Sequence, residues 1–317
     1  MKVYLISALV AFGISWLFSL LLIPLLKKLK AGQNILSYVK EHKAKGGTPT
    51  MGGIAFISAA VFAAILFIRE AEKSTVLCIV IGLSYMLVGL LDDFLKKIHK
   101  ENLGLRAWQK LLFQVLIAVF SGVYCFRAGL TNLHIPFFDK TFDIGFWVIA
   151  LAVFVFIATV NAVNLTDGLD GLAAGTSVPF FASLGLLISL QAENGNMATL
   201  CFCMAGALLA YLIFNVSPAS VFMGDTGSLS LGGFAASIAV FTGNALYIAV
   251  IGACFVFSVI SVIIQVIYYK ATGGKRVFLM APIHHHFQEK GFSESRISYV
   301  YSLVTLILGT VCIIFAL

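Results

Sequence analysis

Long apolar segments separated by short polar ones make up most of this 317-residue chain. About 20 apolar residues are enough for a helix to cross a hydrocarbon core ~30 Å thick. The pattern predicts ten membrane-spanning helices, near residues 3–26, 51–68, 75–91, 108–126, 146–161, 172–190, 197–214, 228–241, 245–268 and 297–316. The segment 130–144 differs, because β-forming residues surround Asp139-Lys140 and predict a small hairpin outside the membrane.

Composition agrees with this pattern. Apolar residues make up 60% of the chain and charged residues 11%, with a mean hydropathy of +1.01. A soluble domain of this length would carry about a quarter charged residues. We therefore expect an all-α integral membrane protein of about ten transmembrane helices, with residues 1–317 forming a single polytopic domain.

Basic residues predict the orientation of the chain. The loops after the first, third and ninth predicted spans hold 16 of the 21 lysines and arginines. Because cytoplasmic loops carry the excess of basic residues, we expect these loops inside and both termini outside.

Side chains capable of chemistry fall on the same inner side. The inner ends of spans and the inner loops contain Asp92, Asp93, Asp167, Asp170, Asp225 and His284 to His286. Transporters usually place ionisable residues near the bilayer midplane, on helices related by internal repeats. No predicted span has a carboxylate at its middle, and no repeat is evident, so an enzyme at the cytoplasmic face is favoured over a pump or channel.

The first motif is Asp92-Asp93, where the third span emerges. Adjacent residues on a helix point about 100° apart, so the two carboxylates are not expected to share one role. Lys96 follows Asp92 at i+4, on the same face, and is expected to pair with it. Two acids at this position suit a general base or a Mg²⁺ ligand, and an ordinary solvated helix end is the alternative.

The second motif places polar residues at every third position: Asn161, Asn164, Asp167 and Asp170. A straight helix would spread these side chains through a wide arc. A span that unwinds into a glycine-containing loop would let them converge, and its amides would be able to approach a phosphate or a base. An ordinary polar turn is the alternative.

The third motif is Gly224-Asp225, just before the eighth span, with Asn215 and Phe222 upstream. A helix N-terminus favours anions such as phosphate, and the alternative is that Asp225 only caps the helix.

The fourth motif is the triplet His284 to His286. Consecutive side chains point apart, so we expect these histidines to line a phosphate or sugar pocket, or to supply an acid–base group near pH 7, rather than to chelate one ion.

A fifth, weaker motif precedes the second span. Lys45, Thr50 and the glycines around them resemble an anion cradle with free backbone amides, although the spacing is not that of a Walker A sequence. Lys110 adds a cation at the start of the fourth span. Carboxylates for a metal, cations for developing charge and a base are the components of phosphoryl transfer. Their position at a membrane surface predicts that one reactant is a lipid.

These motifs resemble those of the polyprenyl-phosphate N-acetylhexosamine-1-phosphate transferases over essentially the whole chain. The family pattern is matched by Asp-Asp-x-x-Lys at 92–96, Asn-x-x-Asn-x-x-Asp-Gly-x-Asp-Gly at 161–171 and Gly-Asp at 224–225. Gly-Thr-Pro-Thr-Met-Gly-Gly at 47–53 and Ala-Pro-Ile-His-His-His-Phe at 281–287 are similar to the muramoyl-pentapeptide branch of that family.

The resemblance implies transfer of phospho-N-acetylmuramoyl-pentapeptide from UDP-MurNAc-pentapeptide to undecaprenyl phosphate in the bacterial inner membrane. The products would be lipid I, for peptidoglycan synthesis, and UMP. Mg²⁺ would be the cofactor, the active site would face the cytoplasm, and no nucleic-acid partner is expected. A homodimer is left open.

The resemblance also implies residue roles. Asp225 would be the chief metal ligand, and Asp92 and Asp93 would serve the lipid phosphate or the metal. Gly168, Leu169, Asp170 and Phe222 would hold the uridine. The remaining substrate contacts would come from Lys45, Thr50, Lys96, Lys110, Asn161, Asn164, Asp167, Asn215, His284, His285 and His286.

Two other functions are kept as alternatives. A sister enzyme would use UDP-GlcNAc, although the histidine triplet argues against it, and a lipid or ion transporter would show no chemical turnover. For the transferase, direct attack by the lipid phosphate on the β-phosphate of UDP is favoured over a covalent carboxylate intermediate, because a metal-bound carboxylate is a poorer nucleophile.

Overall fold

The computed structural model describes the chain except residues 30–46, 69, 71, 100–103, 139 and 192–194. Its helices are α1 (Lys2–Lys28), α2 (Gly53–Phe67), α3 (Lys73–His99), α4 (Ala107–Ala128), α5 (Val148–Thr166), α6 (Leu172–Leu190), α7 (Gly195–Asn215), α8 (Gly224–Phe241), α9 (Ala245–Ile251), α10 (Ala253–Ala271), α11 (Ile283–Glu289) and α12 (Glu294–Ile314). A short 3₁₀ helix, η2 (Gly145–Trp147), precedes α5.

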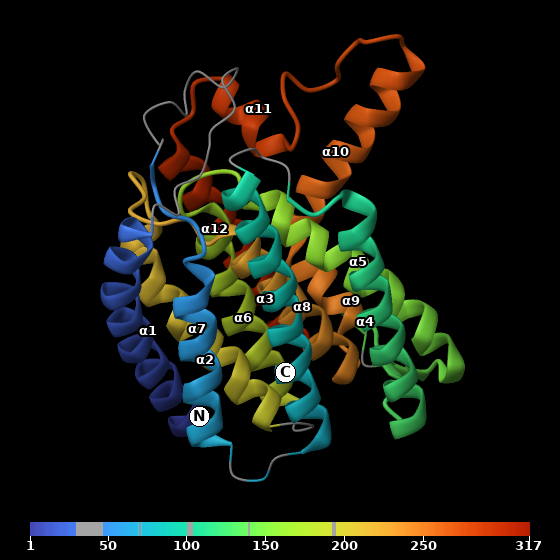
Figure 1. Cartoon of the computed structure of the whole chain (residues 1–317). Coiled ribbons are helices and arrows are strands. Elements are labelled where there is room, and N and C mark those ends of the chain that lie inside the picture. The colour runs from blue at the N-terminus through green and yellow to red at the C-terminus, as the bar shows by residue number, and fades with distance from the viewer. Residues whose placement is uncertain (30–46, 69, 71, 100–103, 139, 192–194) are drawn as a thin grey trace.

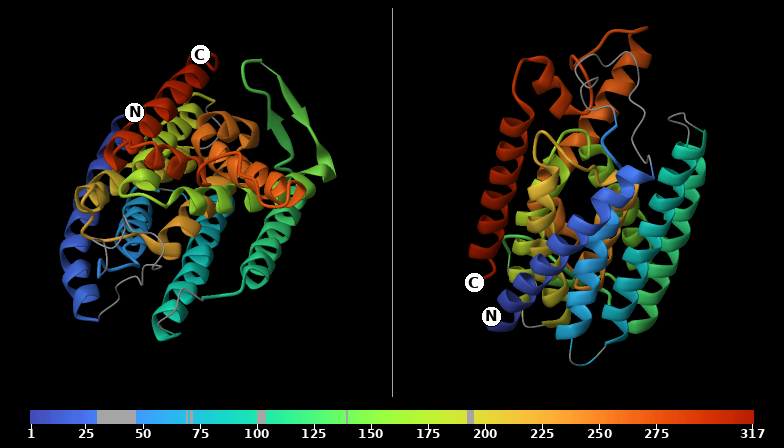
Figure 2. Two further views of the ribbon diagram at one scale, coloured as in Figure 1. Left: turned by 90° about the horizontal axis from the view of Figure 1, so that it is seen from above. Right: turned by 60° about the vertical axis from the view of Figure 1, so that its left-hand side comes forward.

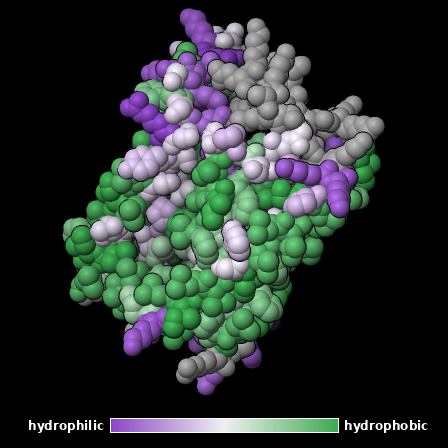
Figure 3. All heavy atoms as spheres, turned by 90° about the vertical axis from the view of Figure 1, so that its left-hand side faces the viewer, coloured by the Kyte–Doolittle hydropathy of each residue, from purple (hydrophilic) through white to green (hydrophobic). Residues whose placement is uncertain are grey.

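The expectation of an all-helical membrane protein is confirmed. Each of the ten predicted spans corresponds to a described helix, except that the ninth is divided between α9 and α10. Eight of the described helices are long and apolar enough to cross a membrane. The predicted spans outside that set are α2, which has only 15 residues, and α8, which starts with Gly224 and Asp225 and is rich in small residues. In Figure 3 apolar side chains form a broad belt, with polar side chains gathered mainly at one end.

Helix α8 lies inside the bundle, and from Thr226 to Phe241 every one of its residues is buried. It packs against α3, α5 and α2 (Figure 1). Small residues allow this close approach, as is usual between membrane helices. A Cβ atom on Gly53 of α2 would collide with the backbone of Gly227 on α8. The first turn of α8, which contains Asp225, is therefore held by neighbouring helices.

The bundle has two different ends. Beyond one end, α10 extends away from the other helices and the chain returns through α11 to α12 (Figures 1 and 2). Both termini lie at the opposite end. The predicted hairpin is present there as strands β1 (Asn132–His134) and β2 (Thr141–Asp143), antiparallel with Leu133 opposite Phe142. The ring of Phe137 in its turn contacts Phe315 near the C-terminus.

Candidate active site

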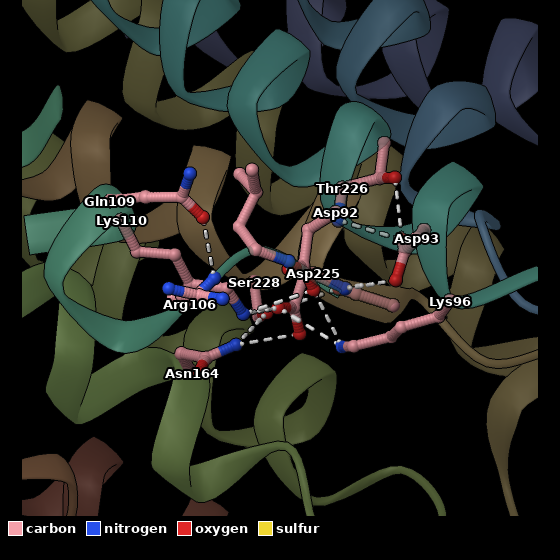
Figure 4. Close-up of polar contacts among 12 residues, drawn as sticks. Asp92, Asp93, Lys96, Arg106, Gln109, Lys110, Asn164, Asp225, Thr226 and Ser228 are labelled. Atoms are coloured by element: carbon pink, nitrogen blue, oxygen red, sulfur yellow. Dashed lines mark hydrogen bonds and ion pairs between the residues drawn. The ribbon is translucent and has the colours of Figure 1, made fainter. Parts of the chain in front are cut away.

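Two carboxylates and two lysines form the centre of the site (Figure 4). The Lys110 ammonium lies 2.6 Å from Asp225 and 3.0 Å from Asp92, and the Lys96 ammonium lies 2.7 Å from Asp92 and 3.3 Å from Asp225. Each lysine thus bridges both acids. We call these four residues the lysine–carboxylate square.

Three helices bring the square together. Asp92 and Lys96 are one turn apart on α3, so the predicted i, i+4 ion pair is confirmed. Lys110 lies in the first turn of α4, whose start is fixed by the Arg106 amide donating to the side chain of Gln109. Asp225 lies at the start of α8. Opposite charges at these short distances attract one another, and this attraction holds the ends of the three helices together.

Further contacts fix the direction of each carboxylate in the square. The other oxygen of Asp92 accepts the Leu105 amide N–H at 2.7 Å. The other oxygen of Asp225 accepts from the Asn164 side chain at 3.1 Å, and the same amide donates to Ser228 at 2.9 Å. Both acids are therefore bound through both oxygens, so that their orientation is set before any substrate arrives.

The acids also fit a divalent cation. Asp92, Asp93 and Asp225 each bring one oxygen within 4.8 Å of the others, and carboxylate oxygens are the protein ligands that Mg²⁺ prefers. The side chain of Asp225 is 15% exposed, whereas that of Asp92 is fully buried. Asp225 is therefore the most accessible ligand of the square.

Only some of the polar side chains in the motif at 161–171 contact the lysine–carboxylate square. Asn164 contacts Asp225, but the Asn161 side chain donates to Gln114 on α4 at 2.8 Å and to the Ile157 carbonyl at 2.8 Å. Asp170 is buried and accepts the Ala219 amide N–H at 3.0 Å. The helix does end at Thr166, as the predicted unwinding requires.

Asp167 follows directly on the last turn of α5. Burial raises the pKa of its carboxyl to about 8, and the negative charges of Asp225 and Asp93 add to this shift. At neutral pH this side chain therefore holds a proton and offers a hydrogen-bond donor.

The histidine triplet does not have three equivalent side chains. His284 is fully buried, and both of its ring nitrogens are without a hydrogen-bond partner among the described residues. Burial and the neighbouring His285 lower its pKa to about 3. The expectation of an acid–base group near pH 7 is therefore wrong for His284, since its ring stays neutral there. His286 accepts the Leu279 amide N–H through Nδ1 at 3.1 Å and so braces the preceding segment.

The histidines nevertheless lie beside the glycine-containing loop after α5. A Cβ atom on Gly168 would be 2.6 Å from Nε2 of His284 and 3.0 Å from Nε2 of His285. Glu294, the first residue of α12, also contacts this loop: its carboxylate accepts the Asp170 amide N–H at 2.9 Å. The structure therefore joins the second and fourth motifs, which are more than 100 residues apart.

The interpretation of residues 45–53 as an anion cradle with free amides is wrong for Gly52 and Gly53. The Gly52 amide donates to the Phe222 carbonyl at 2.9 Å, and the Gly53 amide donates to the Met223 carbonyl at 3.1 Å. These glycines allow α2 to approach the start of α8 instead. Thr50 is nearly buried beside them, whereas Lys45 lies outside the described residues.

The loop between α7 and α8 is held from several directions. The buried Asn215 side chain donates to the Val221 carbonyl at 2.9 Å. The Phe222 amide donates to the Pro49 carbonyl at 2.8 Å, while its side chain stays partly exposed. These contacts place Phe222 next to the start of α8.

Sequence reasoning missed four residues around the site: Leu105, Gln114, Thr226 and Glu294. Gln114 had a usable signal, because it is a polar residue one turn after Lys110 within an apolar span. The backbone contact of Leu105 leaves no trace in the residue type.

Comparison with known proteins identifies the family of this chain. The model of glycosyl transferase family 4 matches residues 74–243, more than half of the chain. With the fold and the charged site, this match defines a multi-pass membrane enzyme that transfers phosphosugars.

Curated relatives give the narrower assignment. Phospho-N-acetylmuramoyl-pentapeptide-transferase of Clostridium novyi (strain NT) is 43% identical over 97% of this chain and 95% of its own length. The proteins of the same name from Bacillus subtilis (strain 168) and Listeria monocytogenes are each 42% identical, over 97% and 96% of this chain and 96% and 97% of their own lengths. The chain belongs to the phospho-N-acetylmuramoyl-pentapeptide-transferase family, and the expected resemblance is confirmed.

Proposed function

We propose that this chain transfers phospho-N-acetylmuramoyl-pentapeptide from UDP-MurNAc-pentapeptide to undecaprenyl phosphate, giving lipid I and UMP. The names of its relatives support this reaction. In that role residues 1–317 form one transferase domain in the bacterial cytoplasmic membrane, with the lysine–carboxylate square facing the cytoplasm. The alternative that no chemistry occurs, as in a transporter, is not supported by the family.

The lysine–carboxylate square is the observation that carries the proposal. The side chain of Lys96 is 28% exposed and that of Lys110 is 23% exposed, so both side chains are partly accessible from the outside of the bundle. Phosphoryl transfer depends on cations that neutralise charge on the phosphates as the transition state forms. Two lysines fixed by the same two carboxylates provide such charge in a preorganised geometry.

Asp225 would hold Mg²⁺, because its carboxylate is the accessible one of the square. When bound, the ion would neutralise phosphate charge. Other residues of the site orient this carboxylate and balance its charge. Asn164 fixes the orientation of Asp225, and the ammonium groups of Lys96 and Lys110 balance the charge of its carboxylate.

The nucleotide would bind at the loop after α5. Gly168, Leu169 and Asp170 would hold the uracil and ribose, and the partly exposed ring of Phe222 would stack on the base. This proposal is supported by the histidines that pack against Gly168 and by the contact from Asp170 to the loop that contains Phe222. The wider site would include Lys45, Thr50, Asp167, Asn215, His284, His285 and His286.

We propose direct transfer. An oxygen of the lipid phosphate attacks the β-phosphorus, a new P–O bond forms, and the bond from that phosphorus to the oxygen bridging the α-phosphate breaks, so that UMP leaves with the bonding electrons. A covalent route needs a free carboxylate nucleophile. Both Asp92 and Asp225 instead contact two ammonium groups each, which weakens either as a nucleophile.

Product analysis tests the proposal and its nearest alternative together. Purified protein would be incubated with a polyprenyl phosphate, Mg²⁺ and either UDP-MurNAc-pentapeptide or UDP-GlcNAc. The extracted lipids would then be identified by mass spectrometry. We expect a lipid-linked phosphomuramoyl-pentapeptide from the first nucleotide and no lipid product from the second. Product from UDP-GlcNAc alone would establish the sister activity instead.

A further inference from the structure

Asp93 differs from its neighbour Asp92 in what it contacts, although both lie at the end of α3. Asp92 faces the two lysines, whereas Asp93 is turned toward the first turn of α8. One oxygen of Asp93 accepts the Asp225 amide N–H at 3.2 Å. The other accepts the amide N–H of Thr226 at 3.0 Å and its hydroxyl at 2.7 Å.

These three contacts satisfy groups that a helix cannot satisfy by itself. The first N–H groups of any α-helix have no partner within the helix, and the residue before α8, Met223, provides no side-chain cap. Asp93 supplies the cap from a different helix. Its negative charge is also well placed at the positive end of the α8 dipole.

Close packing leaves the Asp93 carboxylate little freedom to turn elsewhere. Asp93 is 4% exposed. Gly224 has a φ of +69°, and a Cβ atom there would collide with the Asp93 carboxylate and lie 2.5 Å from the hydroxyl of Thr50. One turn earlier on α3, a Cβ atom on Gly89 would collide with the carbonyl of Asp225. The backbones of α3 and α8 are therefore in contact one turn before Asp93, and Gly224 packs directly against its carboxylate.

We propose that Asp93 is a positioning residue that caps α8 and so fixes Asp225, and that it contacts neither the lipid phosphate nor the metal ion. This assignment rests on the proposed function for the identity of the reaction. A carboxylate has about four acceptor positions, and three of those on Asp93 are taken by donors of α8. To use any of these three positions for a metal or a proton of the substrate, Asp93 would have to release a donor in the turn that contains Asp225.

Thr226 makes the proposal testable without changing any charged group. Its side chain is fully buried and bonds to Asp93, so Thr226→Val removes one donor with little change in shape. We expect this variant to lower kcat and to raise the Mg²⁺ concentration for half-maximal rate, each about 3- to 10-fold, the loss typical of one hydrogen bond within a protein. Ser230→Ala is the matched control, since Ser230 is a buried hydroxyl on α8 that bonds to the Gly82 carbonyl of α3, and it should leave both values within twofold.

Substitutions at Asp93 separate capping from chemistry. Asp93→Asn keeps an acceptor for α8, so it should retain at least about tenfold more activity than Asp93→Ala and keep the shape of the wild-type pH–rate profile. The double variant Asp93→Ala with Thr226→Val should be no slower than Asp93→Ala alone. If Asp93→Asn were as inactive as Asp93→Ala while Thr226→Val turned over at the wild-type rate, Asp93 would be acting directly and the proposal would be overturned.

Thermal unfolding in detergent tests the same contact without turnover. The losses in Tm caused by Asp93→Ala and Thr226→Val should be less than additive in the double variant, because both remove the same interaction. Strict additivity would overturn the cap. UMP release by the wild-type protein tests the proposed function separately, so a failure of that reaction is distinguishable from a failure of the cap.

Discussion

Single residues in this site act mainly through fixed charge. Lys110 reaches both acids of the square from α4 and has no partner on its own helix among these contacts. Its ammonium therefore connects α3, α4 and α8 at one point. Removal of that charge would leave two neighbouring carboxylates compensated by Lys96 alone, and like charges at such distances destabilise each other.

We predict that Lys110→Met lowers kcat about 100-fold, the usual loss when one preorganised charge-stabilising group is removed. Lys110→Arg keeps the charge and should recover part of this loss. Steady-state UMP release gives both values. Rates within twofold of wild type for Lys110→Met would show that this ammonium has no part in the transfer.

A second residue-scale prediction concerns pH. The pKa of His284 is about 3 in the folded protein against an ordinary value of 6.5, so between these values the unfolded chain binds the extra proton. The contribution of His284 to the free energy of unfolding is therefore fully present above pH 6.5. It is lost as the pH is lowered toward 3, by about 2 kcal/mol between pH 6.5 and 5. Thermal unfolding in detergent should show a smaller acid-induced drop in Tm for His284→Gln than for wild type. Equal drops would place the acid sensitivity elsewhere.

At the scale of helices, the contact between α4 and α5 sets the distance between the groups that hold Asp225. Gln114 lies one turn beyond Lys110 on α4, and Asn161 lies one turn before Asn164 on α5. Their side-chain amides bond to each other in both directions, at 2.8 and 3.5 Å.

We predict that Gln114→Leu lowers the stability by about 1 kcal/mol, the order found for hydrogen bonds between membrane helices, and also lowers kcat. The exchanged pair Gln114→Asn with Asn161→Gln restores two facing amides and should recover most of both losses. Tm and kcat of the three variants provide the measurement. An exchanged pair no better than Gln114→Leu would mean that the amides are not acting as a bridge.

Helices were more predictable from this sequence than the contacts between them. Hydropathy located the ten apolar segments, and the i, i+4 spacing gave the pair of Asp92 with Lys96. Neither signal reports which helices are neighbours, so the contact of Lys110 with Asp225, 115 residues away, had no local trace. The same limit explains the wrong expectation at Gly52 and Gly53. Their amides donate to residues 222–223, and this pairing depends on the tertiary fold, so the local sequence carries no sign that these amides are occupied.

On the scale of the whole molecule, chemistry is confined to one end of an apolar bundle. The end of α3 and the start of α4, which carry three residues of the square, lie toward that end together with α11 (Figure 1), and the hairpin and both termini lie at the other (Figures 1 and 2). Which end faces the cytoplasm follows from the distribution of basic residues and stays a prediction.

Thiol labelling tests this orientation. The six native cysteines are buried, so a membrane-impermeant reagent should report introduced ones. In intact cells we expect labelling of Asn132→Cys in the hairpin and not of Ser295→Cys at the start of α12, and the reverse in inside-out vesicles. Both positions are exposed in the structure. Labelling of Ser295→Cys in intact cells would reverse the orientation.

The most direct measurement for the whole account is Mg²⁺-dependent UMP release from UDP-MurNAc-pentapeptide and a polyprenyl phosphate, with wild type beside Asp225→Asn. We predict release by the wild type, none after EDTA, and a rate at least about 1,000-fold lower for the variant, since one substitution would remove both a metal ligand and a charge of the square. A variant with a near-normal rate and unchanged Mg²⁺ dependence would contradict the role of Asp225 and the site built around it.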